Sequence, residues 1–289
     1  MRVREEVFKE LVQLERRQAS PSLSLDGIEL RGAQLRHIDL RGANISLRYA
    51  RLERADLAGA HLERAILAGA YLDDADLSDA HLEGAELQGA YLRGAILWDA
   101  HLQNANLTVA HLERSPQAPY ETTCLIDAHL HDAYLSHANL QKANARGARF
   151  VRAHLDEANL RDSDLRNASL VEAQLQGADL DNAQVTLTDF RWAELTGTRL
   201  LRTKLDLARL EGALYGAYDV AFSIGKLTLF PNDFDPTMAG MYNWEHYGYL
   251  DYCIAVNLCE VRYEVRQAGV LGLGTYREDT QSEEVCAGP

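Results

Sequence analysis

The sequence is poor in aromatic residues and in long apolar runs. Only 8% of its 289 residues are Phe, Trp or Tyr, so aliphatic side chains must fill the hydrophobic core. The four cysteines are too few and too scattered for a disulfide framework. No apolar stretch approaches the ~18 residues of a membrane-spanning helix, and the charged start MRVREEVFKELVQLERRQ has no signal-peptide core. We therefore expect a soluble, cytoplasmic protein without a membrane partner.

The sequence also lacks the motifs that carry catalysis. It has no glycine-rich phosphate-binding loop and no G-x-S-x-G, and Cys253 and Cys259 do not have the C-x-x-C spacing of a zinc site. The formal charge of −14 argues against nucleic acid as a direct partner, because its backbone is itself polyanionic. We expect a protein without catalytic residues and without a cofactor.

A leucine recurs at every fifth residue through most of the chain. From position 55 to 114, twelve consecutive units read A-x-L-x-x, beginning ADLAG AHLER AILAG. The same period runs over residues 25–45 and resumes over 125–215. A period of five fits neither an α-helix nor a β-strand. It fits a coil in which each unit forms one side, with large Leu and small Ala both pointing inward.

Outward-facing positions repeat with a second period of 20 residues. His61, His81 and His101 are 20 apart, and so are Tyr71 and Tyr91. These positions have no packing reason to match. The 20-residue repeat therefore predicts four units per coil, with like residues stacked on one side. A recent internal duplication is the alternative explanation.

The pattern resembles that of the pentapeptide-repeat family, A-[D/N]-L-x-x, over roughly residues 23–215. The resemblance implies an all-β solenoid, a right-handed quadrilateral β-helix whose four short sides form each coil. The chain holds about 37 units, which gives about nine coils. At an inter-strand spacing of ~4.8 Å, the stack would be about 43 Å long.

The frame breaks twice. Seven residues separate Ile45 from Leu52, which predicts a small bulge. Thirteen separate Leu112 from Leu125, three more than two units, and this predicts a protruding loop over residues 113–124. Loops on rigid scaffolds often carry function, although a neutral insertion is the alternative. The candidate interaction residues of the loop are Pro116, Pro119 and Tyr120.

Both ends of the chain lie outside the repeat. Apolar residues at helical spacing within residues 1–22 predict a helix that caps the first coil. Residues 216–289 form a C-terminal cap or interaction region, for which we expect mixed or helical structure and a disordered end. The spacing from Ile254 to Val265 is helical, although the alternation over 254–258 would also suit a strand. The aromatic candidate interface there is Tyr242, Trp244, Tyr247, Tyr249 and Tyr252.

A short segment after the repeat, TLFPNDFDPTMAGM, resembles an ending that follows the coils of some family members. Within it, Asp235 and Pro236 have the order expected of a helix N-cap and the first helical residue.

Two groups of polar residues are candidates for chemistry. The stacked imidazoles of His61, His81 and His101 could share a metal ion. Such sites also need converging ligands and supporting contacts, so we expect a surface ladder without metal. The segment 127–137 holds three His and two Asp residues, but they face outward on a convex wall, whereas catalysis needs a concave pocket.

Two functions fit these observations. The first is a non-catalytic scaffold whose flat sides bind a protein partner with little loss of entropy. The second is implied by the resemblance, because quinolone-resistance members of the family imitate B-DNA and occupy the DNA site of type II topoisomerases such as gyrase. The partner is then an unidentified protein or a topoisomerase. The chain itself would be a monomer, or a homodimer joined through the C-terminal region.

The charge distribution separates the two functions. Residues 21–215 hold 20 basic and 28 acidic side chains, a net −8, whereas about 25 charges would line ~43 Å of B-DNA. The charges are also grouped by sign, which favours the scaffold. The candidate acidic belt is Asp73, Asp74, Asp76, Asp79, Glu83 and Glu86. Two basic belts comprise Lys142, Arg146, Arg149 and Arg152, and Arg191, Arg199, Arg202, Lys204 and Arg209.

Overall fold

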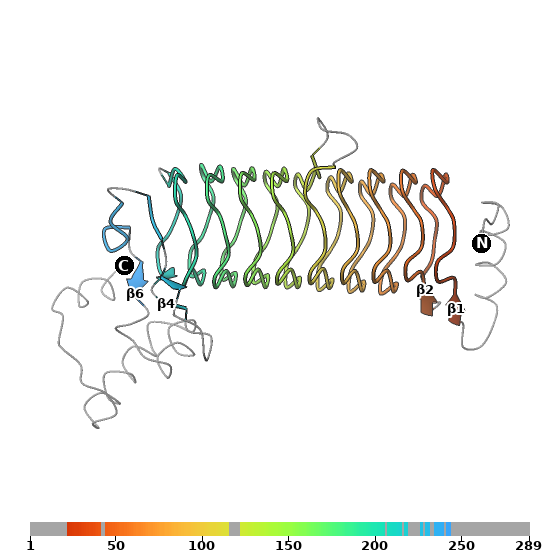
Figure 1. Ribbon diagram of the computed structural model, residues 1–289, viewed down its shortest axis with the longest axis horizontal. Coiled ribbons are helices and arrows are strands. Elements are labelled where there is room, and N and C mark those ends of the chain that lie inside the picture. Colours follow the sequence, from red (N-terminus) through yellow and green to blue (C-terminus); the bar gives the residue numbers. More distant parts are fainter. Residues whose placement is uncertain are drawn as a thin grey trace, which may run out of the picture. The chain divides into compact units, whose positions relative to one another are not determined.

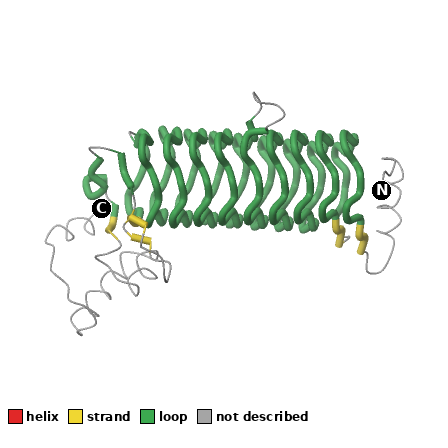
Figure 2. Tube along the Cα trace, in the orientation of Figure 1, coloured by secondary structure: helices red, strands yellow, loops and turns green. Residues whose placement is uncertain are grey.

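In a computed structural model of the chain, the repeat region forms a row of stacked coils (Figure 1). The structure describes residues 22–41, 44–115, 122–205, 207–215, 217–218, 226–227, 229–231, 234–239 and 241–243. Turns and bridges dominate these residues, with short strands near both ends of the repeat (Figure 2). No helix occurs among them, so this part of the chain holds no helix that could cross a bilayer.

Each five-residue unit forms one side of a coil and then turns. In the unit around Leu57, for example, the amide of Ala60 donates a hydrogen bond to the Leu57 carbonyl over 2.9 Å, which closes a β-turn. The third residue of the turn has a positive φ, as in a type II turn. Gly59 occupies this position in one unit, and Asp74 and Asn104 occupy it in others with φ of 57° and 58°. These are residue types that tolerate the left-handed region.

The coils are joined by parallel β-bridges between residues 20 apart. Leu57 donates to the carbonyl of Asp76 over 2.7 Å, and Asp76 donates back to the carbonyl of Ala55 over 3.0 Å. This spacing confirms four units per coil and the expected β-helix solenoid. One side can be followed through nine bridged residues of the described chain: Asp39, His61, His81, His101, His129, Arg149, Ser169, Asp189 and Arg209.

Leucine and alanine fill the interior, as the repeat predicts. Nearly every central leucine from Leu52 to Leu200 and nearly every preceding alanine is buried, with exposed fractions of 0–3%. Phe150 and Phe190 replace leucine at two positions and are fully buried. The apolar core is continuous along the stack, so each coil is stabilised by both of its neighbours.

The described residues include six short strands, which lie near the ends of the repeat. β1 (Ser22–Ser24) pairs in parallel with β2 (Asn44–Ser46), with Ser22 opposite Asn44. β4 (Ala217–Tyr218) pairs antiparallel with β5 (Lys226–Leu227). The remaining two are β3 (Leu214–Tyr215) and β6 (Tyr242–Asn243).

The first break lies earlier than the sequence predicts. The bridge partner of Ile66 is Ser46, so Leu47 is the central leucine of its side and Ile45 takes the preceding alanine position. Both side chains are buried, at 2% and 1% exposure. The two extra residues therefore lie between Leu40 and Leu47. The prediction that the break follows Ile45 was wrong. Ile45 and Leu47 both point inward, and the sequence alone does not show which of them is the central residue of the unit.

The second break is a single insertion of eight residues. His111 bridges Tyr91, and the next bridge of the following side pairs Ile96 with Cys124, 28 residues apart instead of 20. The chain from Leu112 to Leu125 therefore makes a single step from one side of the coil to the next, with eight extra residues inserted in it. The core continues across it, because Thr123 occupies an alanine position and is fully buried.

The C-terminal end of the core is covered by residues that follow the repeat. Leu229 continues one side of the stack by bridging Arg199. Tyr215 and Phe230 meet edge to face at 5.6 Å, and Phe230 and Phe234 lie 5.1 Å apart. Met241 is only 4% exposed and belongs to the same core. The described part of the family-like ending therefore closes the last coil.

The carboxylate of Asp235 caps a turn in this ending. It accepts hydrogen bonds from the backbone amides of Thr237 and Met238, at 2.9 and 3.4 Å. These contacts are those of an N-cap, as the sequence predicts, but the described residues 236–239 form a turn and not a helix. The helix expected within residues 1–22 lies outside the described residues except for Ser22, which begins β1. The helix expected over residues 254–265 also lies outside them.

A buried carboxyl lies on the side that includes His154 and Gln174. Glu194 is 8% exposed and accepts a hydrogen bond from Thr196 Oγ1 over 3.2 Å. Burial raises its pKa to about 7, and the nearby Asp156 carboxyl adds to the shift. Since the unfolded chain has the ordinary value of 4.5, the folded state binds more protons between these two pH values.

Deleting residues 115–122 should leave the stack intact. The deletion joins Arg114 to Thr123 and restores a five-residue step from Leu112 to Leu125, so every bridge beyond it keeps its partner. We expect the far-UV circular dichroism to be unchanged and the melting temperature to shift by no more than about 5 °C. An aggregated or unfolded product would show that the insertion holds the two halves together.

Glu194→Gln should stabilise the protein more as the pH rises. The raised folded-state pKa means that the wild-type free energy of unfolding falls from pH 4.5 to 7, by up to about 3 kcal/mol. The glutamine amide does not titrate, so the free energy of unfolding of the variant should not fall over this pH range. Urea unfolding at pH 5, 6, 7 and 8 measures the difference, with the exposed Glu172→Gln as control. A variant–wild-type difference that is constant with pH would contradict the assignment.

Candidate functional site

A histidine ladder runs along one side of the stack. The rings of His61 and His81 are stacked with centroids 4.6 Å apart and planes 7° apart. His81 and His101 follow at 4.8 Å, and His101 and His129 at 4.9 Å. The β-bridges impose this spacing, because each imidazole projects outward from a strand one coil away from the next. The sequence prediction of a stacked ladder is thus confirmed in its geometry.

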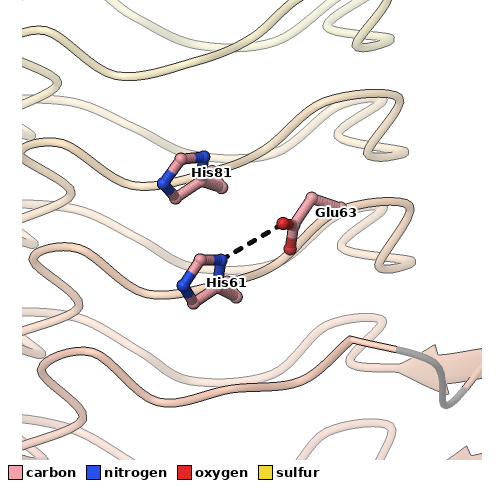
Figure 3. Close-up of side chains that lie close together, drawn as sticks. All are labelled: His61, Glu63 and His81. Carbon is pink, nitrogen blue, oxygen red and sulfur yellow. Dashed lines mark hydrogen bonds and ion pairs between the residues drawn. The ribbon is translucent and has the colours of Figure 1, made fainter.

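Each of the first two rungs also carries a glutamate. His61 Nδ1 lies 3.2 Å from Glu63 Oε1 (Figure 3). In the next coil, His81 Nδ1 lies 3.3 Å from Glu83 Oε1. The pairing follows from the repeat, since residues on either side of the central leucine project from the same side of the coil. The ladder therefore combines imidazole nitrogens with carboxylate oxygens.

A second aromatic ladder occupies another side. Tyr71 stacks on Tyr91 at 5.1 Å, and Tyr91 stacks on His111 at 4.7 Å. Guanidinium groups lie over two of the rings, with Arg51 5.2 Å from the Tyr71 centroid and Arg93 5.1 Å from the Tyr91 centroid. Contacts of this kind favour a rigid surface.

The polar cluster of residues 127–137 does not converge on one point. Asp132 accepts two hydrogen bonds from the Arg152 guanidinium, at 2.7 and 2.8 Å, and this contact lowers the Asp132 pKa. His137 faces Glu157 at 3.7 Å on a different side of the coil. Burial, the neighbouring His129 and two arginines lower the pKa of His131. These residues have separate partners, so the cluster offers no shared site.

Three of the six residues of the acidic belt are paired with arginine. Asp73 is 7% exposed and accepts hydrogen bonds from the backbone amide and the Nε of Arg93, both at 3.1 Å. Asp74 lies 3.8 Å from Arg54. A further pair joins Asp76 to Arg36 at 4.0 Å, and Glu83 faces a histidine. The surface around this coil has mixed charge.

Three arginines of the second basic belt are paired with aspartate. Asp189 lies 2.7 Å from Arg191 in its own unit and 3.3 Å from Arg209 in the next coil. Arg199 contacts Asp181 at 2.6 Å. Most of these pairs join neighbouring coils, and the 20-residue period decides which charges meet.

The structure reveals an exposed apolar patch that the sequence analysis missed. We call Ile96, Trp98, Cys124 and Ile126 the apolar patch. Ile96 and Trp98 are 42% and 52% exposed, whereas Cys124 and Ile126 are half-buried. Ile96 bridges Cys124. The backbone amide of Asp99, which follows Trp98, donates a hydrogen bond to the Ile126 carbonyl over 3.0 Å. In the sequence, Ile96 and Cys124 are 28 residues apart. They are identified as neighbours only when the insertion is counted as eight residues.

The other predicted interaction residues lie mostly beyond the described part of the chain. The loop residues Pro116, Pro119 and Tyr120 are outside it. So are Trp244, Tyr247, Tyr249 and Tyr252. Tyr242 begins β6. The apolar patch adjoins the predicted loop directly, because Cys124 is the first bridged residue after the insertion.

Several solved structures are similar to this chain. HetL, a pentapeptide repeat protein involved in heterocyst differentiation regulation from the cyanobacterium Nostoc sp. strain PCC 7120, is 28% identical; the match covers 74% of this chain and 96% of HetL, with a TM-score of 0.38. QnrB1, a plasmid-mediated fluoroquinolone resistance protein, is 15% identical over 89% and 98% of the two chains, with a TM-score of 0.42. Rfr23 from the cyanobacterium Cyanothece 51142 is 24% identical over 54% and 90%, with a TM-score of 0.24.

No curated protein sequence matches the chain. The family model for pentapeptide repeats, in contrast, matches in eight copies over residues 45–85, 85–115, 123–150, 148–186 and 173–212. These matches span more than half of the sequence and coincide with the bridged coils. The chain therefore belongs to the pentapeptide-repeat family.

Proposed function

We propose that the protein is a non-catalytic scaffold that binds a protein partner through the side of the stack that carries the apolar patch. The observation that supports this is the pair of large side chains, Ile96 and Trp98, exposed on a side whose backbone is fixed by bridges to both neighbouring coils. A preordered surface loses little entropy on binding.

The composition of the apolar patch supports a protein partner. Trp is enriched among residues that dominate binding energy, especially where neighbouring contacts exclude water. Trp98 has Ile126 beside it in the next coil, on the side that begins directly after the insertion. A partner that presents an apolar side chain would bury Trp98 against this neighbour, and the insertion would add contacts at the edge.

The interior gives no support to catalysis. It is filled by a continuous cluster of apolar side chains, most of them leucine and alanine. The outward side chains lie on flat or convex walls, where water competes for every polar group. We therefore propose that the protein is not an enzyme and works in the cytoplasm, as expected for a chain with four scattered cysteines.

The second candidate is a DNA-mimicking protein that protects a topoisomerase such as gyrase. The net charge of −14 and the exposed Asp79 in the acidic belt favour it. The arginines paired with Asp73, Asp74 and Asp76 weigh against it, because a mimic of B-DNA needs an uncompensated row of negative charge. The mixed-charge surface supports the scaffold as the first proposal.

We propose a monomer as the solution state. Phe230, Phe234 and Met241 already cover the C-terminal end of the core from within the same chain. A homodimer through the C-terminal region remains the alternative, and light scattering of the full-length protein distinguishes the two.

Ile96→Ala/Trp98→Ala should abolish partner binding without loss of the fold. The matched control is Tyr134→Ala, which removes an aromatic ring of 46% exposure from a different side. Immobilised wild type and the control should retain the same cellular protein, and the double variant should lose it, with a fall in affinity of about tenfold or more. Equal retention by all three would place the binding surface elsewhere and overturn the proposal for this patch.

Gyrase should be unaffected by this protein. Under the scaffold proposal, DNA supercoiling by gyrase proceeds at the same rate with and without the full-length chain at micromolar concentration. Its inhibition by a quinolone also stays the same. Protection against the quinolone, or direct inhibition of supercoiling, would establish the second candidate instead.

A further inference from the structure

The histidine ladder places three metal-ligating side chains together twice. His61, Glu63 and His81 each offer one ligand atom, and these atoms all lie within 4.8 Å of one another (Figure 3). The next coil repeats the arrangement with His81, Glu83 and His101. Among the described residues these are the two such groups, and they share His81.

The carboxylates of both groups have an unused oxygen. Glu63 Oε1 and Glu83 Oε1 face a histidine, whereas Oε2 of each is buried and has no hydrogen-bond partner among the described residues. A buried carboxylate oxygen without a partner is costly, and a cation would satisfy it. Both triads therefore offer two imidazoles and one under-satisfied carboxylate.

We propose that this ladder binds one divalent transition-metal ion, with Zn²⁺ as the probe, through His61, Glu63 and His81 or through the overlapping triad of His81, Glu83 and His101. Two imidazoles and one carboxylate form a common ligand set for Zn²⁺, with water as the fourth ligand. Because His81 is shared, one ion per chain is expected.

Binding requires the two imidazole rings to rotate, because the lone pairs of parallel stacked rings do not converge on one point. A tetrahedral ion with bonds of ~2.0–2.2 Å brings its ligand atoms to about 3.3–3.5 Å from each other. The His61–Glu63 contact is already 3.2 Å and needs little change. The rings of His61 and His81 are parallel, so they must rotate until a nitrogen of each points at the same ion. The side chains of His61, Glu63 and His81 are 28%, 26% and 35% exposed, which leaves room for this rotation. The ion would then link two neighbouring coils.

The neighbouring rungs lack the complete set. Gln103 replaces the glutamate beside His101, and His129 already lies 3.3 Å from Asp99. On the tyrosine side, His111 and Glu113 are 3.5 Å apart, but the ring stacked on His111 belongs to Tyr91. The His111–Glu113 pair is therefore a matched control, with one imidazole and one carboxylate but no second imidazole.

Titration of the full-length chain, purified without a histidine tag, with Zn²⁺ by calorimetry tests the proposal. We expect one ion per chain and a melting temperature that rises with zinc concentration. His81→Asn should weaken binding by about tenfold or more, because it removes the shared ligand. Asparagine is compatible with the stack, since Asn139 and Asn159 bridge one another at the equivalent position of another side. The control His111→Asn should bind as wild type does.

A spectroscopic readout separates this site from general affinity for metal. Co²⁺ in place of Zn²⁺ should give the intense visible absorption of a tetrahedral site in wild type and in His111→Asn, and a weak octahedral spectrum in His81→Asn. The double variant Glu63→Gln/Glu83→Gln should also lose the intense tetrahedral absorption. Zinc binding that is absent in wild type, or equal in wild type and His81→Asn, would overturn the proposal.

Discussion

The whole structure depends on the filling of a narrow four-sided interior by leucine and alanine. The core leucines from Leu52 to Leu200 are almost completely buried, and they leave room for nothing larger except Phe150 and Phe190. A single coil could not bury these side chains on both faces. The stack is therefore stable only as a continuous row, in which backbone bridges hold each coil at one inter-strand spacing from the next.

The same constraint orders the outer surface. Since the bridges fix residues 20 apart side by side, whichever residue types repeat at that spacing form ladders. Histidines stack on histidines, tyrosines on tyrosines, and Asp132 meets Arg152. Exposed charge pairs contribute little energy one by one. Their effect here is to leave a surface of mixed charge on a rigid backbone, and this surface is the basis of the proposed protein-binding role.

Departures from the repeat are tolerated where they leave the interior unchanged. The eight-residue insertion does not interrupt the core, because Thr123 restores the small inward residue before Leu125. The apolar patch lies directly beside this insertion, on a side where Ile96 and Trp98 have no inward role. The metal-ligating triads also use outward positions only. Binding functions can thus be added to this fold without cost to its core.

The sequence by itself determined the period of five, the inward Leu and Ala, the four-sided coil and the histidine ladder. These are local features, because each unit contains its own core residues and its own turn. Only the tertiary structure decided what happens at the breaks. The spacing of thirteen from Leu112 to Leu125 fits either one unit boundary with a long insertion or two units with a short one. The bridge from Ile96 to Cys124 decides for the first, because pairing between coils depends on which backbone groups meet in space and not on distance along the chain.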